Sequence, residues 1–374
     1  MPEKTEPRME DEGVSGIDPG GGHEELAGAN LAGRNLSGRD LSGRDLSGAN
    51  LKGARLSKVN LEGATLSGAN LEGADLRDAN LAMATADKTN LKGADLCGAC
   101  LEQTDLTGAD LRKARLVRAN LTEANLSEAS LDQADLADAN FSLATLSQAC
   151  LIDANLPGVN FSDAQLTKAN LSRAVLRAAK LQTALLKETI FIEANLEDAD
   201  FNDAIIDSVV FAGASLTRAR LPNADLKRCD LSHCDLQAAD LTGTTAERCA
   251  FQGANLSELS AADSSFEFSD LRDACLKGAK LLRASLVGVN AMGAVFEETD
   301  LRESNLYWTD LTREALTRCR TEHARWPEAV NVAYGPERAA PPQVQVKCVH
   351  VSPLTDTERR TRAVERPNKE QNHG

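Results

Sequence analysis

A large apolar residue recurs at nearly every fifth position over most of this chain. The series begins at Leu26 and ends at Leu316, which makes 59 consecutive steps without an insertion or a deletion. A small residue, most often Ala, stands two positions before each centre, and Asn or Asp often lies between, as in SGANLEGADL at 67–76. A period of five fits neither the 3.6 of a helix nor the two of a plain strand. The chain must therefore turn after each short extended piece.

Such steps can form the four sides of a square coil. The central residue and the small residue before it then point inward, and the other three side chains face solvent. Four steps close a coil of 20 residues, and stacked coils pair their backbones in parallel, so that nearly all backbone groups are satisfied. The 59 steps predict about 15 coils, and at about 4.8 Å for each coil they predict a rod of about 70 Å.

The repeated A-(D/N)-L-x-x pattern resembles that of the pentapeptide-repeat family, and the match covers residues 26–320. The resemblance implies an all-β fold, a right-handed quadrilateral parallel β-helix of the solenoid type. Members of the family differ in function, so the fold carries little functional information.

The flanking segments differ in composition from the repeats. Residues 1–25 carry a net charge of −6 and are rich in Gly and Pro, which predicts a disordered acidic arm. The segment 321–338, with Trp326 and Pro327, resembles the Trp-Pro closing segment that follows many bacterial pentapeptide arrays. We expect Trp326 to lie across the last coil as a cap. Residues 339–374 lack the period and are expected to form a disordered tail.

Charge and cysteine content limit the classes of partner and the compartment. The net charge of −15 disfavours direct binding of nucleic acid, because phosphates need basic groups to neutralise them. The chain has neither a signal-peptide pattern nor an apolar run of about 18 residues, which argues against secretion and membrane insertion. Nine cysteines, an odd number without the spacing of a small secreted domain, favour reduced thiols and a cytoplasmic protein.

Three arginines stand at inward positions of the first coil. Arg34, Arg39 and Arg44 occupy places that Ala holds in later coils. We expect their aliphatic stems to cover the exposed end of the core while their charged heads reach solvent. The alternative is an anion or partner site on this terminal face.

Four central positions hold Ala instead of a larger residue, which removes volume from the core. They are Ala86, Ala246, Ala261 and Ala291. Near one of them, Leu259 takes the small position and moves the bulk by two residues. The sequence therefore predicts that 244–270 is the least regular part of the array.

Outward aliphatic residues gather in one region of the array. Because positions 20 apart should stack, Leu185 is expected below Ile205, and Ile190 below Val210, where Asn or Asp usually stands. Ile192 adds to the same neighbourhood. Contiguous exposed apolar surface usually marks a contact site, so we predict that these five residues bind a protein partner. The alternative is that outward β-branched residues only favour extended backbone.

Acidic residues occur in the same stretch of sequence. They are Glu197, Asp198, Asp200, Asp203 and Asp207. An apolar patch with acidic residues around it would suit a basic groove on a partner. The alternative is the mixed charge of an ordinary solvated surface.

No catalytic or metal-binding pattern is found in the sequence. Cys229, Cys234 and Cys249 fall on inward positions near His233, and inward thiols cannot converge on one zinc ion with an outward imidazole. An uninterrupted array has no loops from which to build a cleft, and motifs for phosphate, nucleophile or metalloprotease sites are missing. We therefore expect a protein that is not an enzyme and holds no cofactor or metal.

The function predicted from the sequence is a non-enzymatic scaffold that presents flat faces to a protein partner. The alternative comes from the resemblance to family members that mimic DNA, bind type II topoisomerase (DNA gyrase) and protect it from inhibitors. The acidic charge suits this alternative, but 31 basic residues within 26–320 dilute it. A homodimer through the C-terminal end, near Tyr307 and Trp308, is a further expectation.

Overall fold

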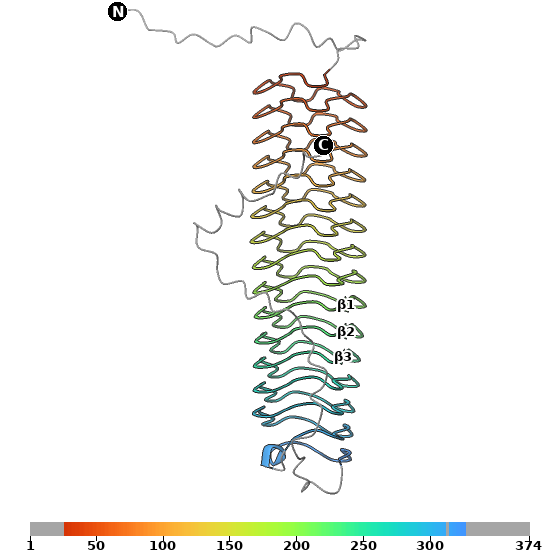
Figure 1. The fold of residues 1–374 in the computed structure, drawn as a ribbon, viewed down its shortest axis with the longest axis vertical. Helices are drawn as coiled ribbons and strands as arrows, with labels where there is room; N and C mark the ends of the chain where they lie inside the picture. Colours follow the sequence, from red (N-terminus) through yellow and green to blue (C-terminus); the bar gives the residue numbers. More distant parts are fainter. Residues whose placement is uncertain (1–25, 312–313, 327–374) are drawn as a thin grey trace, which may run out of the picture. The chain divides into compact units, whose positions relative to one another are not determined.

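The structure, a computed structural model, describes residues 26–311 and 314–326. These residues belong to one compact unit, and a second unit, Tyr334–Gly374, lies outside the described part, as do the predicted arm 1–25 and tail 339–374. Within the described part the backbone repeats one five-residue pattern, and the repeats wind into stacked coils (Figure 1).

Parallel bridges join residues 20 apart along the whole stack. The first described bridge pairs Asn30 with Asn50, and the last pairs Asn305 with Arg325. Four steps therefore form each coil, and each coil hydrogen-bonds to the next, which confirms the predicted parallel β-helix. The paired backbone continues to Arg325, five residues beyond position 320, where the sequence period ends.

Most steps turn through a hydrogen bond within the step and a residue in the left-handed region. The N–H of Ala29 donates to the carbonyl oxygen of Leu26 at 3.1 Å, which closes a four-residue turn. The third residue of the turn has positive φ in every step from Gly28, at 67°, to Trp308, at 62°. This geometry suits glycine, but most steps beyond the first coils place a residue with a side chain there, as Lys58 does with φ of 57°.

Asn and Asp recur before the central residue because their side chains hold the turn and link the coils. The Asp40 carboxylate accepts a hydrogen bond from the N–H of Ser42 at 3.1 Å, which is the geometry of an Asx turn. The Asn90 amide donates to the Asn70 side chain, one coil earlier, at 3.0 Å.

The core consists of the central and small residues of every step, which are almost completely buried. Three of the four central alanines are each followed, one step later, by a buried phenylalanine. The pairs are Ala246 with Phe251, Ala261 with Phe266, and Ala291 with Phe296. The large ring on the neighbouring side of the coil supplies the volume that the alanine lacks, so the backbone can stay regular.

Three strands depart from the pattern and form a parallel sheet in the order β1-β2-β3. They are β1 (Ile205–Asp207), β2 (Asp225–Lys227) and β3 (Thr245–Glu247). A 3-10 helix, η1 (Glu314–Leu316), follows near the end of the described chain. The prediction that 244–270 is the least regular segment was wrong in its bounds, because β1 and β2 lie before it. Within it, β3 departs from the pattern, and at Ala261 the Ser264 hydroxyl donates to the carbonyl at 2.6 Å in place of the backbone N–H.

The three strands form because side chains of the following coil enter the turns that begin within them. After β3, Ser269 Oγ accepts from the Cys249 N–H at 2.9 Å and donates to the Ala246 carbonyl at 2.7 Å. It thus bridges the two groups that close the turn in other steps. After β1, Cys229 Sγ donates to the Ile206 carbonyl at 3.4 Å. The three strands therefore follow one corner through successive coils, not one segment of sequence.

Candidate functional site

Four aliphatic side chains lie on the two faces that adjoin the corner after β1. Bridges place Leu185 beside Ile205 on one face, and Ile190 beside Val210 on the adjoining face. Ile205 is 53% exposed, and the other three are partly exposed. We call these four residues the aliphatic patch.

Polar residues bound the patch along the stack. The column of Leu185 and Ile205 continues to Gln165 in one direction and Asp225 in the other. Ile192, predicted to belong to the patch, lies two residues after Ile190 in the turn that leaves this face, and it is partly buried. The aliphatic patch therefore consists of two short columns on adjoining faces, each two coils high, with the turn that holds Asp207 between them and Ile192 beyond Ile190.

The structure does not gather the five acidic residues around the patch. Asp207 lies in the turn between Ile205 and Val210, and Asp203 lies in the turn just before Ile205. Glu197 precedes Asp207 by ten residues, which is half a coil, so it occupies the opposite corner. Asp198 shares that corner, and Asp200 lies on the next face. The expected acidic surround was wrong because residues close in sequence are distributed around all sides of a coil.

Most of these carboxylates are paired with arginines of the neighbouring coils. Asp198 contacts Arg218 at 2.8 Å, and the Arg218 hydrogen bond holds the pKa of this carboxyl below its usual value. Glu197 pairs with Arg177 at 3.2 Å and also with Arg218. Two further pairs are Asp200 with Arg220 and Asp207 with Arg228. The signal missed in the sequence was an arginine 20 or 21 positions after four of the five carboxylates, all except Asp203.

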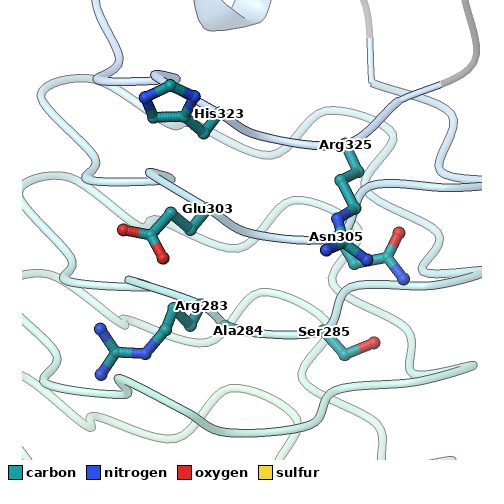
Figure 2. A pocket seen from close by; sticks show the side chains of 7 residues that line it. All are labelled: Arg283, Ala284, Ser285, Glu303, Asn305, His323 and Arg325. Carbon is teal, nitrogen blue, oxygen red and sulfur yellow. The ribbon is translucent and has the colours of Figure 1, made fainter.

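A shallow hollow of about 490 Å³ lies near the C-terminal end of the described chain. Its side chains form two columns, with Arg283, Glu303 and His323 on one side and Ser285, Asn305 and Arg325 on the other (Figure 2). Arg283 makes two hydrogen bonds to Asp263, at 2.6 and 2.7 Å, and Ser285 donates to Glu267 at 2.8 Å. Arg283 and Ser285 are thus engaged with neighbouring coils, and the charges that line the hollow are mixed. The hollow therefore has no set of convergent groups for one ligand.

The three inward cysteines are buried core residues. Cys234 Sγ donates to the Phe211 carbonyl at 2.9 Å, and burial raises the pKa of this thiol to about 12. Cys229 and Cys249 are equally buried. Within 26–311 and 314–326, His, Cys, Asp and Glu side chains form no group of three able to hold a metal ion. The same residues include no helix long and apolar enough to span a membrane.

The chain matches one protein-family model and several solved structures. The chain is similar to HetL, a pentapeptide repeat protein involved in heterocyst differentiation regulation from the cyanobacterium Nostoc sp. strain PCC 7120. The identity is 32%, the match covers 52% of this chain and 88% of that chain, and the TM-score is 0.52. QnrB1, a plasmid-mediated fluoroquinolone resistance protein, matches at 17% identity over 44% of this chain and 91% of its own, with a TM-score of 0.27. No curated protein matches significantly.

The family model of pentapeptide repeats matches nearly the whole array. The matched segments are 25–63, 54–93, 89–127, 124–163, 146–182, 169–207, 208–245, 249–286 and 279–313. Together with the 20-residue coils and the inward Leu and Ala residues, these matches establish the identity of the fold. The chain belongs to the pentapeptide-repeat family.

Proposed function

We propose that this protein is a non-enzymatic scaffold that binds a protein partner through the aliphatic patch. In this proposal the scaffold is a right-handed quadrilateral β-helix of about 15 coils, built by stacking one repeated unit on the next. The observation that carries the proposal is the 53% exposure of Ile205 while it stacks on Leu185. In most other coils this outward position holds Asp, Asn, Thr or Ser.

The patch has the chemistry of a small protein contact. Fully burying an aliphatic side chain of this size contributes about 1.5–3 kcal/mol, and a few such residues can dominate an interface. The β-sheet backbone fixes Leu185, Ile190, Ile205 and Val210 before any partner arrives, so little backbone entropy is lost on binding. The polar residues along the columns limit the contact to two coils.

A second candidate, a DNA mimic that binds type II topoisomerase, is favoured by one column of turn residues. The corner consists of the two middle turn residues that recur every 20 positions, from 42–43 to 262–263. It carries acidic side chains and no basic one. They are Glu62, Glu102, Glu123, Asp163, Asp203 and Asp263. Against this candidate, Glu197, Asp198, Asp200 and Asp207 on other sides are paired with arginines. We therefore place it second.

The test compares aspartate substitutions on two faces of the full-length protein. Ile205→Asp and Ile190→Asp put a charge into the patch, and Val175→Asp puts the same charge at a 37% exposed valine on another face. A pull-down with the unchanged protein identifies the partner, and binding of each variant to that purified partner is then measured. Loss of binding with the patch variants alone supports the proposal. Equal binding by all three variants would reject it.

The second candidate needs a separate assay. Purified protein is added to a gyrase supercoiling reaction with and without an inhibitor. The variant Glu123→Gln, Asp163→Asn, Asp203→Asn removes three charges from the acidic column. If the unchanged protein neither binds gyrase nor alters supercoiling, the DNA-mimic function is excluded.

A further inference from the structure

The first described coil, residues 26–45, presents an open β edge. In later coils the bridging residue donates to the coil before it, as the Asn50 N–H does to the Ala29 carbonyl at 2.9 Å. In the described part of the chain no coil precedes Leu26. Leu26 and Leu31 are 7% and 8% exposed, whereas Leu residues inside the stack are close to 0%. An edge of this kind can pair with another strand unless it is covered.

Three guanidinium groups stand at this edge. Arg34 is exposed and Arg39 and Arg44 are partly exposed, although they occupy the small inward position that Ala49 and Ala54 fill with complete burial. An arginine stem is too long for a space fitted to Ala, so its charged head must extend toward the open end. The exposure pattern therefore places a cluster of positive charge on the end of the stack.

The segment that leads into this coil has the opposite charge. Residues 1–25 contain eight carboxylates and two basic side chains, and they join the coil at Leu26. Twenty-five residues can span up to about 85 Å when extended, which is ample for reaching all sides of the coil. A tethered segment has an effective concentration on the order of millimolar, so that even weak ion pairs with the arginines can hold it.

We propose that the acidic segment 1–25 docks on the first coil through Arg34, Arg39 and Arg44 and covers the open edge. The covering segment hides backbone groups that would otherwise pair with a second copy of the chain. The arginines serve as its attachment point, which accounts for three charged residues at positions that Ala holds in most later coils. Docking depends on charge and is therefore sensitive to salt.

The test measures the chemical accessibility of the arginines in the full-length protein. Phenylglyoxal modifies accessible guanidinium groups, and mass spectrometry follows the rate at each site. The test variant neutralises the segment with Glu10→Gln, Asp11→Asn, Glu12→Gln, Glu24→Gln and Glu25→Gln. The control variant neutralises three acids elsewhere with Asp356→Asn, Glu358→Gln and Glu365→Gln. Arg55, an exposed residue of the second coil, is the internal reference.

The proposal predicts that Arg34, Arg39 and Arg44 react several-fold faster in the test variant than in the unchanged protein or the control variant. About 0.5 M NaCl, where the Debye length falls to about 4 Å, should produce the same increase in the unchanged protein. Equal rates in all three proteins would overturn the proposal. The proposal would also be overturned if protection of the three arginines increased with protein concentration and did not depend on the charge of the segment. That result would identify a second copy of the chain as the group that covers the edge.

Discussion

Exchanging Leu259 and Ala261 tests how the core shares its volume within one coil. Leu259 fills a position that normally holds a small residue, and Ala261 fills one that normally holds a large residue. Both are completely buried, and Phe266 packs in the same layer, with its ring centroid 5.7 Å from that of Phe251. If the two positions share one space, the effects of changing them must be strongly coupled.

The single substitutions have different costs. Leu259→Ala leaves a cavity and should lower the local free energy of unfolding by about 3 kcal/mol. Ala261→Leu adds a side chain to a filled layer and should cost about 2 kcal/mol. The double variant keeps the total volume and restores the family pattern, so it should lose less than about 1.5 kcal/mol. The coupling free energy is then about 3 kcal/mol or more in favour of the double variant.

Hydrogen exchange measures this effect locally, as is needed because long repeat arrays do not unfold in two states. The Ala261 N–H donates to the Lys280 carbonyl at 2.8 Å, and the Lys280 N–H donates to the Leu259 carbonyl at 2.7 Å. These amides should exchange about 100-fold faster in Leu259→Ala, because each 1.4 kcal/mol is a factor of ten, and near the original rate in the double variant. Peptides from 100–125 serve as the control. Additive losses in the double variant would refute the shared space.

Two further predictions concern a glycine and a thiol. Gly288→Ala should lower stability more than Gly93→Ala. Both positions need positive φ, but the new Cβ at 288 would lie 2.7 Å from the Phe268 ring, whereas position 93 is open. Denaturation midpoints of the two variants measure the difference, and equal shifts would contradict a role for the ring. Burial, followed by the Asp132 carboxylate, raises the pKa of the Cys150 thiol to about 12. Because the thiolate is the reactive form, alkylation of Cys150 by iodoacetamide should be slow at pH 8 and become faster toward pH 12. In Asp132→Asn the reaction at pH 8 should be faster than in the unchanged protein. Mass spectrometry of the adducts measures both rates. Fast alkylation in the unchanged protein at pH 8 would show that the thiol is not shielded.

The sequence alone predicted the coil, its period of 20 residues and the set of inward side chains. It could do so because each step contacts mainly its own neighbours, and the same five positions carry the same geometry in every step. The stacking of Leu185 with Ile205 and of Ile190 with Val210 followed from the same rule. Whether this patch binds a partner stays a prediction.

Only the tertiary structure decided where the turns open and which charges are paired. Cys229 donates to the Ile206 carbonyl at 3.4 Å, where the turn has lost its own bond to that oxygen. Cys234 donates to the Phe211 carbonyl at 2.9 Å, and there the turn bond from the Ala214 N–H to the same oxygen remains, at 2.8 Å. Residue type therefore does not fix the outcome, which is decided by contacts between neighbouring coils. The acidic residues from 197 to 207 form one group in sequence but lie on different sides of the coil, opposite arginines of neighbouring coils. Both outcomes are set by contacts between residues about 20 positions apart, and their geometry exists only once the coils have stacked.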